Sequence, residues 1–167
     1  TSQLPEGIVA AHQVIEAFPR PPSRAYEIAA FASYVLGRRA DADAAFAELA
    51  KLDPQEGLEE QADVAIAEGR LTDAAHLLDQ AVGRDRAAGD GEHGEHDQAM
   101  IAAVALRRGD LAAARAAAAR VTGANQDHFL AALVELEAGD AARARAFAAS
   151  LASDVAPLHR AWGQILD

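Results

Sequence analysis

The chain contains no cysteine among its 167 residues, which excludes disulfides, thiolate zinc sites, iron–sulfur clusters and cysteine nucleophiles. Aromatic residues make up only 5% of the chain, so large rings can fill little of its core. Lysine occurs once, as Lys51, and the formal net charge is −11. Binding to a phosphate backbone requires clustered lysine and arginine, so we expect no nucleic-acid partner.

The chain also lacks a long hydrophobic run. Its longest apolar stretches, such as residues 111–119, are short and rich in alanine, so we expect no membrane insertion. The N-terminus has neither the basic nor the apolar region of a signal peptide, which favours the cytoplasm without fixing the compartment. The chain begins at Thr1 and has its single methionine at Met100, so we expect a fragment of a longer protein.

Alanine is abundant instead, with 45 of the 167 positions. Alanine is the best helix former, and its small side chain lets two backbones approach closely. No segment shows the sustained alternation of apolar and polar residues that is typical of strands. The sequence therefore predicts an all-α fold of about eight to ten short helices.

Four glycines divide the alanine-rich segments at intervals of 32, 40 and 30 residues: Gly37, Gly69, Gly109 and Gly139. Each has an alanine seven residues before it and another five residues after it. This pattern predicts four helix–turn–helix units, with glycine in a left-handed turn and the alanines where the two helices cross. The eight alanines are Ala30, Ala62, Ala102 and Ala132 before the turns, and Ala42, Ala74, Ala114 and Ala144 after them.

The first full unit places Tyr26, Gly37, Ala42, Phe46 and the run Leu52-Asp53-Pro54 at the spacing of a tetratricopeptide repeat, and it resembles that family. The resemblance implies a right-handed superhelix (an α-solenoid) of antiparallel helix pairs. It implies one domain over residues 1–167 that begins and ends in mid-repeat, as a fragment of a longer bacterial array would. Its parts are a second helix at 5–22, repeats at 23–54, 55–86, 95–124 and 125–156, and a first helix at 157–167.

The later repeats depart from the family pattern. The second has Arg86 where a proline would end it, and the third and fourth have Ala118 and Ala148 where a large residue is usual. We therefore expect the third and fourth repeats to be the less stable half. The tripeptide Arg108-Gly109-Asp110 matches a cell-adhesion motif, but here we interpret it as a glycine turn followed by an aspartate that caps the next helix.

In the family that the chain resembles, the first helices line a concave groove that binds a peptide or a helix. The middle of this groove would be acidic, so we expect a protein or peptide partner, with a preference for basic or basic-amphipathic segments. The alternative is that these side chains contact neighbouring helices and that the acidic residues favour the helix dipole. The implied positions are Arg24, Glu27, Phe31, Tyr34, Glu56, Glu59, Asp63, Ile66, His96, Ala99, Ala103, Leu106, Arg107, Gln126, Phe129, Leu133 and Leu136.

The glycine-rich stretch at residues 83–97 breaks the rhythm, and we predict a polar loop after a helix that ends near Asp85. His93 and His96, with the nearby carboxylates, are weak candidates for a metal site in this loop. Their spacing matches no zinc or calcium motif, and a loop offers little preorganisation. We therefore expect no metal. No nucleophile elbow or phosphate loop is present, so we predict neither enzyme activity nor a cofactor.

Two further interpretations stay open. The chain could be a structural spacer, or it could self-associate through uncapped apolar ends that carry Val14 and Phe18 at one side and Trp162 and Ile165 at the other. The runs 67–75 and 156–163 look like the helical repeat tails of bacterial signalling proteins. That second resemblance implies a sensor or recruitment part that serves a catalytic domain elsewhere in a larger protein.

Overall fold

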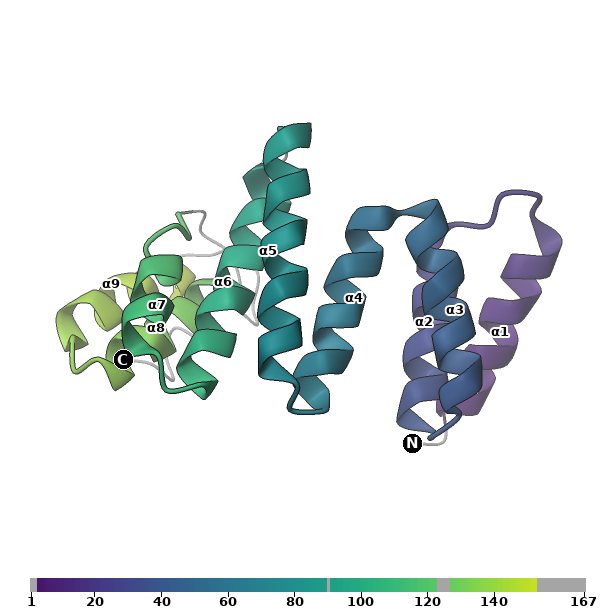
Figure 1. Ribbon diagram of the computed structural model, residues 1–167, viewed down its shortest axis with the longest axis horizontal. Coiled ribbons are helices and arrows are strands. Elements are labelled where there is room, and N and C mark those ends of the chain that lie inside the picture. Colours follow the sequence, from purple (N-terminus) through teal and green to yellow (C-terminus); the bar gives the residue numbers. More distant parts are fainter. Residues whose placement is uncertain (1–2, 90, 123–126, 153–167) are drawn as a thin grey trace. The chain divides into compact units, whose positions relative to one another are not determined.

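The structure is a computed structural model that describes residues 3–89, 91–122 and 127–152 (Figure 1). Within these ranges all regular structure is helical, which confirms the predicted all-α class. The nine helices of the described ranges are α1 (Gln3–Ala17), α2 (Ser23–Val35), α3 (Arg39–Leu52), α4 (Pro54–Ala67), α5 (Leu71–Ala88), α6 (Gly91–Arg107), α7 (Leu111–Ala118), α8 (Asp127–Glu137) and α9 (Ala141–Ala152). None of these helices is long and apolar enough to cross a bilayer.

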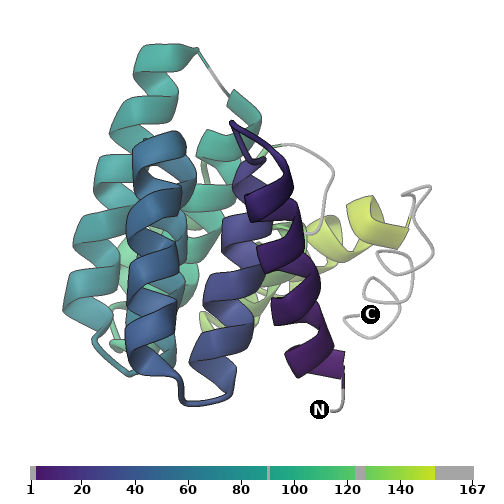
Figure 2. The ribbon, with the colours of Figure 1, turned by 90° about the vertical axis from the view of Figure 1, so that its right-hand side faces the viewer.

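The chain divides into two compact units, Thr1–Gln61 and Ala62–Asp167. In the first unit, α2 packs against both α1 and α3, and Figure 2 shows α1 alongside α2. In the second unit, α6 packs against α5, α7 and α8, and α9 packs against α8. Each unit is thus built from helices that contact their neighbours along the chain.

Four glycine turns join helices with the same backbone geometry. Gly37, Gly69, Gly109 and Gly139 all have φ between 73° and 76°, in the left-handed region that favours glycine. In each turn the glycine N–H donates to the carbonyl three residues back, and the next N–H donates to the carbonyl five residues back. These two hydrogen bonds define a Schellman motif, which satisfies the last carbonyls of the preceding helix. The predicted left-handed glycine turns are confirmed.

The eight alanines that flank these turns are all 0% exposed. The alanine five residues after each glycine also donates its N–H to the carbonyl of the residue that follows the glycine, which starts the second helix. After Gly109, the Asp110 carboxylate accepts a hydrogen bond from the Ala113 N–H at 2.9 Å, which confirms the predicted aspartate cap. A repeated helix–turn–helix unit is therefore present in both parts of the chain.

The first unit has an apolar core with aromatic rings. Phe31 on α2 and Phe46 on α3 meet edge to face, with ring centroids 6.1 Å apart, and Leu49 on α3 is fully buried. Gly57 on α4 lies so close to α3 that a Cβ atom there would come within 2.6 Å of Ala50. Glycine at position 57 thus permits the α3–α4 contact.

The second unit packs smaller apolar residues in two clusters. One gathers alanines of α6, α7 and α8 with Val121 and Val134, and the other joins Ala62, Ala65, Ala74, Leu78 and Val104. This unit also buries acidic groups. Glu135 on α8 is fully buried, 2.9 Å from the guanidinium of Arg115 on α7 and 3.2 Å from that of Arg143 on α9. These two ion pairs tie three helices together.

The predicted polar loop at residues 83–97 is wrong. Helix α5 continues to Ala88, Gly89 ends it with a left-handed φ of 74°, and α6 already runs from Gly91. Gly83 is a helical residue of α5, and Gly94 sits on α6 opposite Asp85, where a Cβ atom would be 3.6 Å from the Asp85 Cβ. The packing of α5 against α6 outweighs the low helix propensity of these glycines.

The predicted helix at residues 5–22 corresponds to α1, which carries Pro5 in its first turn and ends at Ala17, before Pro19, Pro21 and Pro22. The predicted first helix at residues 157–167, with Trp162 and Ile165, lies outside the described residues, as do Asp90 and Gln126.

Candidate functional site

The first helices α2, α4, α6 and α8 carry the residues that the resemblance assigns to a groove. On α2, Phe31 and Tyr34 are half-buried and turn toward α3. Phe31 meets Phe46, and the guanidinium of Arg39 lies 5.2 Å from the centre of the Tyr34 ring. These two aromatic residues therefore contribute to the α2–α3 contact, as the alternative interpretation predicts.

Arg24 in the first unit is an exposed cation that contacts one carboxylate and feels the charge of two others. It forms an ion pair with Glu27 one turn later on α2. The hydrogen bond to Glu27 raises the pKa of Arg24, and the charges of Glu27, Glu56 and Glu60 raise it further. Acidic side chains of α2 and of the start of α4 thus share one electrostatic environment, in which Arg24 is the cation.

The start of α4 also has a local reason for its acidic residues. The Asp53 carboxylate accepts hydrogen bonds from the Gln55 and Glu56 backbone N–H groups, both at 3.1 Å, and so caps the helix. The Gln55 side chain donates to Glu59 at 2.9 Å. Negative charge is stabilising at a helix N-terminus, so Glu56 and Glu59 favour α4 whether or not a partner binds.

In the second unit, three first helices meet through charged side chains. His96 Nδ1 on α6 lies 2.8 Å from Asp127 Oδ1 on α8. Burial raises the pKa of Asp63 on α4, and the charge of His96 opposes that shift. His96 therefore contacts a carboxylate of α8, and its charge also acts on the carboxylate of Asp63 on α4.

Ile66, Leu106 and Arg107 also lie where α4 and α6 meet. Arg107 Nη1 donates to the carbonyl of Ile66 at 3.2 Å and so satisfies an acceptor near the end of α4. Ile66 and Leu106 are half-buried and pack against the apolar clusters. These side chains therefore stabilise the helix contacts, and only part of the Ile66 and Leu106 surface stays exposed.

The other groove positions differ in exposure. Phe129 and Leu133 on α8 and Ala103 on α6 are half-buried, whereas Leu136 is exposed. Ala99 is fully buried in the cluster of α6, α7 and α8, so its predicted place on the groove surface is wrong.

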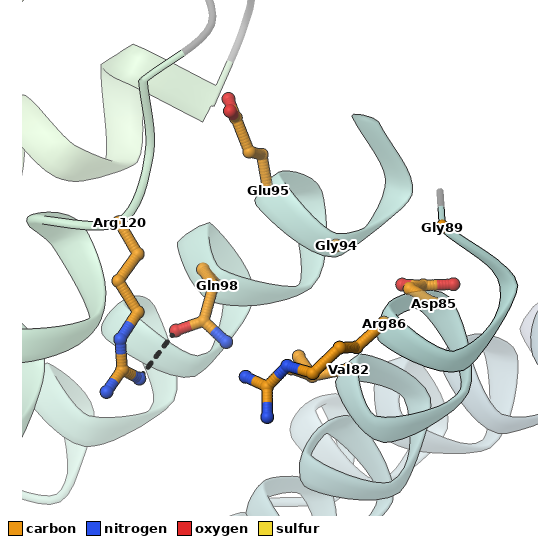
Figure 3. Close-up of a pocket in the computed structure, with 8 residues that line it drawn as sticks. All are labelled: Val82, Asp85, Arg86, Gly89, Gly94, Glu95, Gln98 and Arg120. Atoms are coloured by element: carbon orange, nitrogen blue, oxygen red, sulfur yellow. Dashed lines mark hydrogen bonds between the residues drawn. The ribbon is translucent and has the colours of Figure 1, made fainter. Parts of the chain in front are cut away.

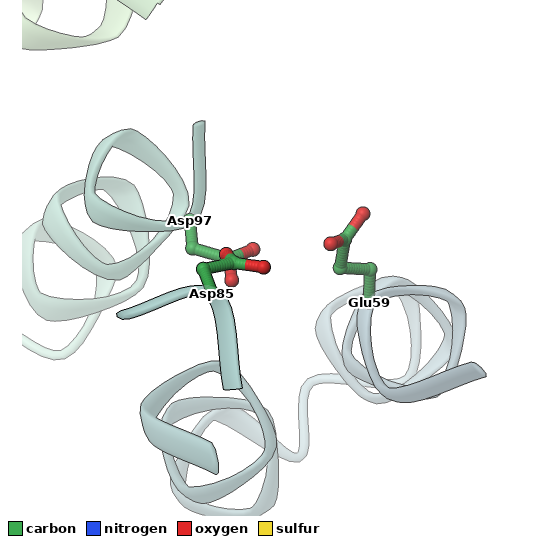
Figure 4. Close-up of side chains that lie close together, drawn as sticks. All are labelled: Glu59, Asp85 and Asp97. Atoms are coloured by element: carbon green, nitrogen blue, oxygen red, sulfur yellow. The ribbon is translucent and has the colours of Figure 1, made fainter. Parts of the chain in front are cut away.

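The metal hypothesis for His93 and His96 loses its structural basis, since both residues lie on α6 and the expected loop does not exist. Among the described residues, neither histidine belongs to a cluster of three close ligand atoms. The structure shows another pair that sequence reasoning missed. Asp85 on α5 and Asp97 on α6 are buried, and their side chains meet with carboxylate oxygens within 4.8 Å (Figure 4).

Comparison with protein-family models, curated proteins and solved structures found no match to this chain.

Proposed function

We propose that this chain is a protein-interaction scaffold that binds a peptide or a helix along the first helices of its hairpins. The observation that carries the proposal is the fourfold repetition of one turn and two buried alanines, which presents α2, α4, α6 and α8 as equivalent elements. We propose that these hairpins form a right-handed α-solenoid of the tetratricopeptide type. Repeat proteins of this kind use extended faces for recognition.

The proposed partner is a basic or basic-amphipathic segment. In the first unit, Glu27, Glu56, Glu59 and Glu60 contribute four carboxylates around α2 and α4. The net charge of −11 would attract a cationic peptide and raise its association rate at low salt. In the second unit, half-buried Phe129 and Leu133 on α8 would offer apolar contact to a segment that binds there.

Calorimetric titration of the chain with three peptides of equal length, one basic-amphipathic, one acidic and one neutral, tests this function. We expect the basic peptide to bind at least tenfold more tightly than the acidic one, with a difference that shrinks as salt is added. Equal affinity for the basic and acidic peptides would overturn the proposal.

A pair of double variants locates the face. Glu56→Gln with Glu59→Gln removes two charges from α4 and should weaken binding of the basic peptide. Asp43→Asn with Glu48→Gln removes two charges from the second helix α3 of the same unit, where both residues are exposed. That control should leave affinity unchanged at moderate salt, and an equal loss in both variants would indicate net charge alone instead of a binding face.

Self-association is the second candidate, because Val9 on α1 and Phe18 just beyond it are 57% and 56% exposed. Under this proposal, light scattering across a concentration series should show growing assemblies that the Phe18→Ser variant reduces. A monomer at all concentrations would exclude it. The sensor or recruitment role in a larger bacterial signalling protein stays a prediction that the full reading frame would test.

A further inference from the structure

A cavity of about 400 Å³ lies in the second unit, where the end of α5, the start of α6 and the segment after α7 come together (Figure 3). Its volume falls within the range of about 300–1,000 Å³ that is usual for small-ligand sites. Gly89 and Gly94 form part of its wall, and a Cβ atom at Gly89 would contact no atom within 4 Å. The backbone there borders open space, so the cavity has room for a small organic molecule.

The Gln98 side chain on α6 lines this cavity and is only 6% exposed. Its Oε1 accepts a hydrogen bond from Arg120 Nη1 at 3.1 Å. Because a guanidinium group can only donate, the amide oxygen faces Arg120 and the amide nitrogen faces away from it. Figure 3 shows this nitrogen on the side of Arg86, and no described residue accepts a hydrogen bond from it. Its two N–H donors are therefore available to a molecule in the cavity.

Two guanidinium groups belong to the same lining. Arg120 has four N–H donors besides the one that it directs at Gln98. Arg86 on α5 makes no hydrogen bond or ion pair through its side chain within the described ranges. Figure 3 draws the Gln98 amide between the two guanidinium groups. The hydrogen-bonding capacity that remains in this part of the cavity thus consists of donors on two cations and one amide, which suits an anion with several oxygens.

The two carboxylates of the lining, those of Asp85 and Glu95, have other partners. Glu95 accepts hydrogen bonds from the Thr122 backbone N–H, at 3.1 Å, and from the Thr122 hydroxyl, one through each of its oxygens. Asp85 has an interaction of its own and lies close to Asp97 on α6. Figure 3 draws both carboxylates well away from the two guanidinium groups. The part of the cavity around Gln98 is therefore rich in donors and is separate from the acidic side chains.

We propose that this cavity binds a small organic anion, whose carboxylate or phosphate group lies between Arg86 and Arg120. The NH₂ group of Gln98 donates a further hydrogen bond to the same group. Guanidinium groups match the geometry of both carboxylate and phosphate oxygens, and such charge-assisted hydrogen bonds are stronger than neutral ones. Val82 and the two glycines offer uncharged surface to the rest of the ligand, so its organic part is small and uncharged.

This site shares no residue with the proposed peptide-binding positions, because its lining comes from α5, the first turns of α6 and the segment after α7. Failure of peptide binding would therefore leave this proposal intact, and failure of anion binding would leave the peptide proposal intact.

Titration of the full chain with butyrate and with propyl phosphate, in a buffer free of other carboxylates and phosphates, tests the proposal. We expect saturable calorimetric binding of at least one of them, and the comparison of the two shows whether the site takes a carboxylate or a phosphate. The neutral analogues butyramide and propanol should bind at least tenfold more weakly. Binding of neither anion would overturn the proposal, and so would equal binding of an anion and its neutral analogue.

Nuclear magnetic resonance locates the anion within the cavity. The side-chain NH₂ resonances of Gln98 should shift during the titration with the anion that binds, because these donors gain an acceptor. The side-chain NH₂ resonances of Gln80, which is exposed on α5 and does not line the cavity, should stay in place. Saturable binding without a shift at Gln98 would contradict the proposed position.

Two arginine variants assign the binding to this cavity. Arg86→Ala should weaken binding at least tenfold and leave the thermal midpoint of the free chain unchanged, because the side chain has no partner to lose. Arg84→Ala is the matched control, since it removes the same charge at an exposed position of the same helix that does not line the cavity. Unchanged affinity in Arg86→Ala, or an equal loss in Arg84→Ala, would contradict the assignment.

Discussion

The same type of glycine turn occurs in both units, but their interiors are filled by different side chains. The first unit packs Phe31 against Phe46 around Leu49, and Ser33 is the buried polar residue among its described positions. The second unit relies on alanines and valines and buries six polar or charged residues, which are Asp85, Asp97, Gln98, Asp127, His128 and Glu135. Alanines cannot fill a core by volume, so helices approach closely and charged groups become enclosed. The backbone repeat is thus compatible with two kinds of interior.

The largest expected effect is the loss of the aromatic contact in the first unit. Phe46→Ala removes a buried ring that meets Phe31, and we expect the free energy of unfolding to fall by about 3–5 kcal/mol. Phe18→Ala removes an exposed ring and should change stability by less than about 0.5 kcal/mol. Chemical denaturation followed by circular dichroism measures both, and similar midpoints for the two variants would refute a ring-filled core.

At the corresponding position in the third hairpin, a larger side chain should lower the free energy of unfolding, whereas in the first hairpin a smaller one does so. Ala118, like Phe46, lies nine residues after its turn glycine, and it is fully buried in the alanine cluster. We expect Ala118→Leu to destabilise the chain by about 1–3 kcal/mol, because Ala118 is fully enclosed by the cluster and three more carbons would have to displace its neighbours. A stabilising effect in the same denaturation experiment would show instead that this hairpin is under-filled.

Replacing the turn glycine should lower the free energy of unfolding by the same amount in both units. Gly37→Ala and Gly109→Ala each force a Cβ into the left-handed region, and we expect each to lose about 1–2 kcal/mol. Gly83→Ala is the control, since Gly83 is helical, exposed and free of neighbours, and it should gain about 0.5–1 kcal/mol. A large difference between the first two variants would show that the turns are not equivalent.

The smallest expected effect is a pH dependence that belongs to the second unit. Burial lowers the pKa of His128, while the charges of Glu95 and Asp127 oppose the shift. The unfolded chain therefore takes up this proton at a higher pH than the folded one. Stability is complete above the ordinary histidine pKa of about 6.5 and falls as the pH drops below it.

Hydrogen exchange on α8, corrected for the intrinsic exchange rate at each pH, should show this loss as lower protection factors at pH 5.5 than at pH 7.5, by on the order of 1 kcal/mol or less. His128→Gln should remove it, and His76→Gln, at an exposed site on α5, should not. Burial instead raises the pKa of Asp63, so the contribution of this group to the stability of the folded chain falls as the pH rises above about 4. Protection factors that are equal at both pH values would argue against an uncharged buried His128.

Sequence reasoning succeeded where the physical cause is local. A glycine at positive φ and an alanine at a helix crossing follow from steric limits at single positions, and all four turns and all eight alanines agree with the structure. It failed at residues 83–97, where propensity predicts a loop. Contacts between α5 and α6, with Gly94 opposite Asp85, hold both segments helical.

The sequence by itself therefore determined the helical class, the positions of the turns and the register of the buried alanines, because each depends on backbone sterics and side-chain volume at fixed spacings. Only the tertiary structure decided which polar groups became buried together. No local sequence pattern predicts which polar side chains meet across the helices. The structure shows three such pairs: His96 with Asp127, Asp85 with Asp97, and Arg120 with Gln98. These pairs come from helix packing, which brings together residues that are 12 to 31 positions apart in the chain.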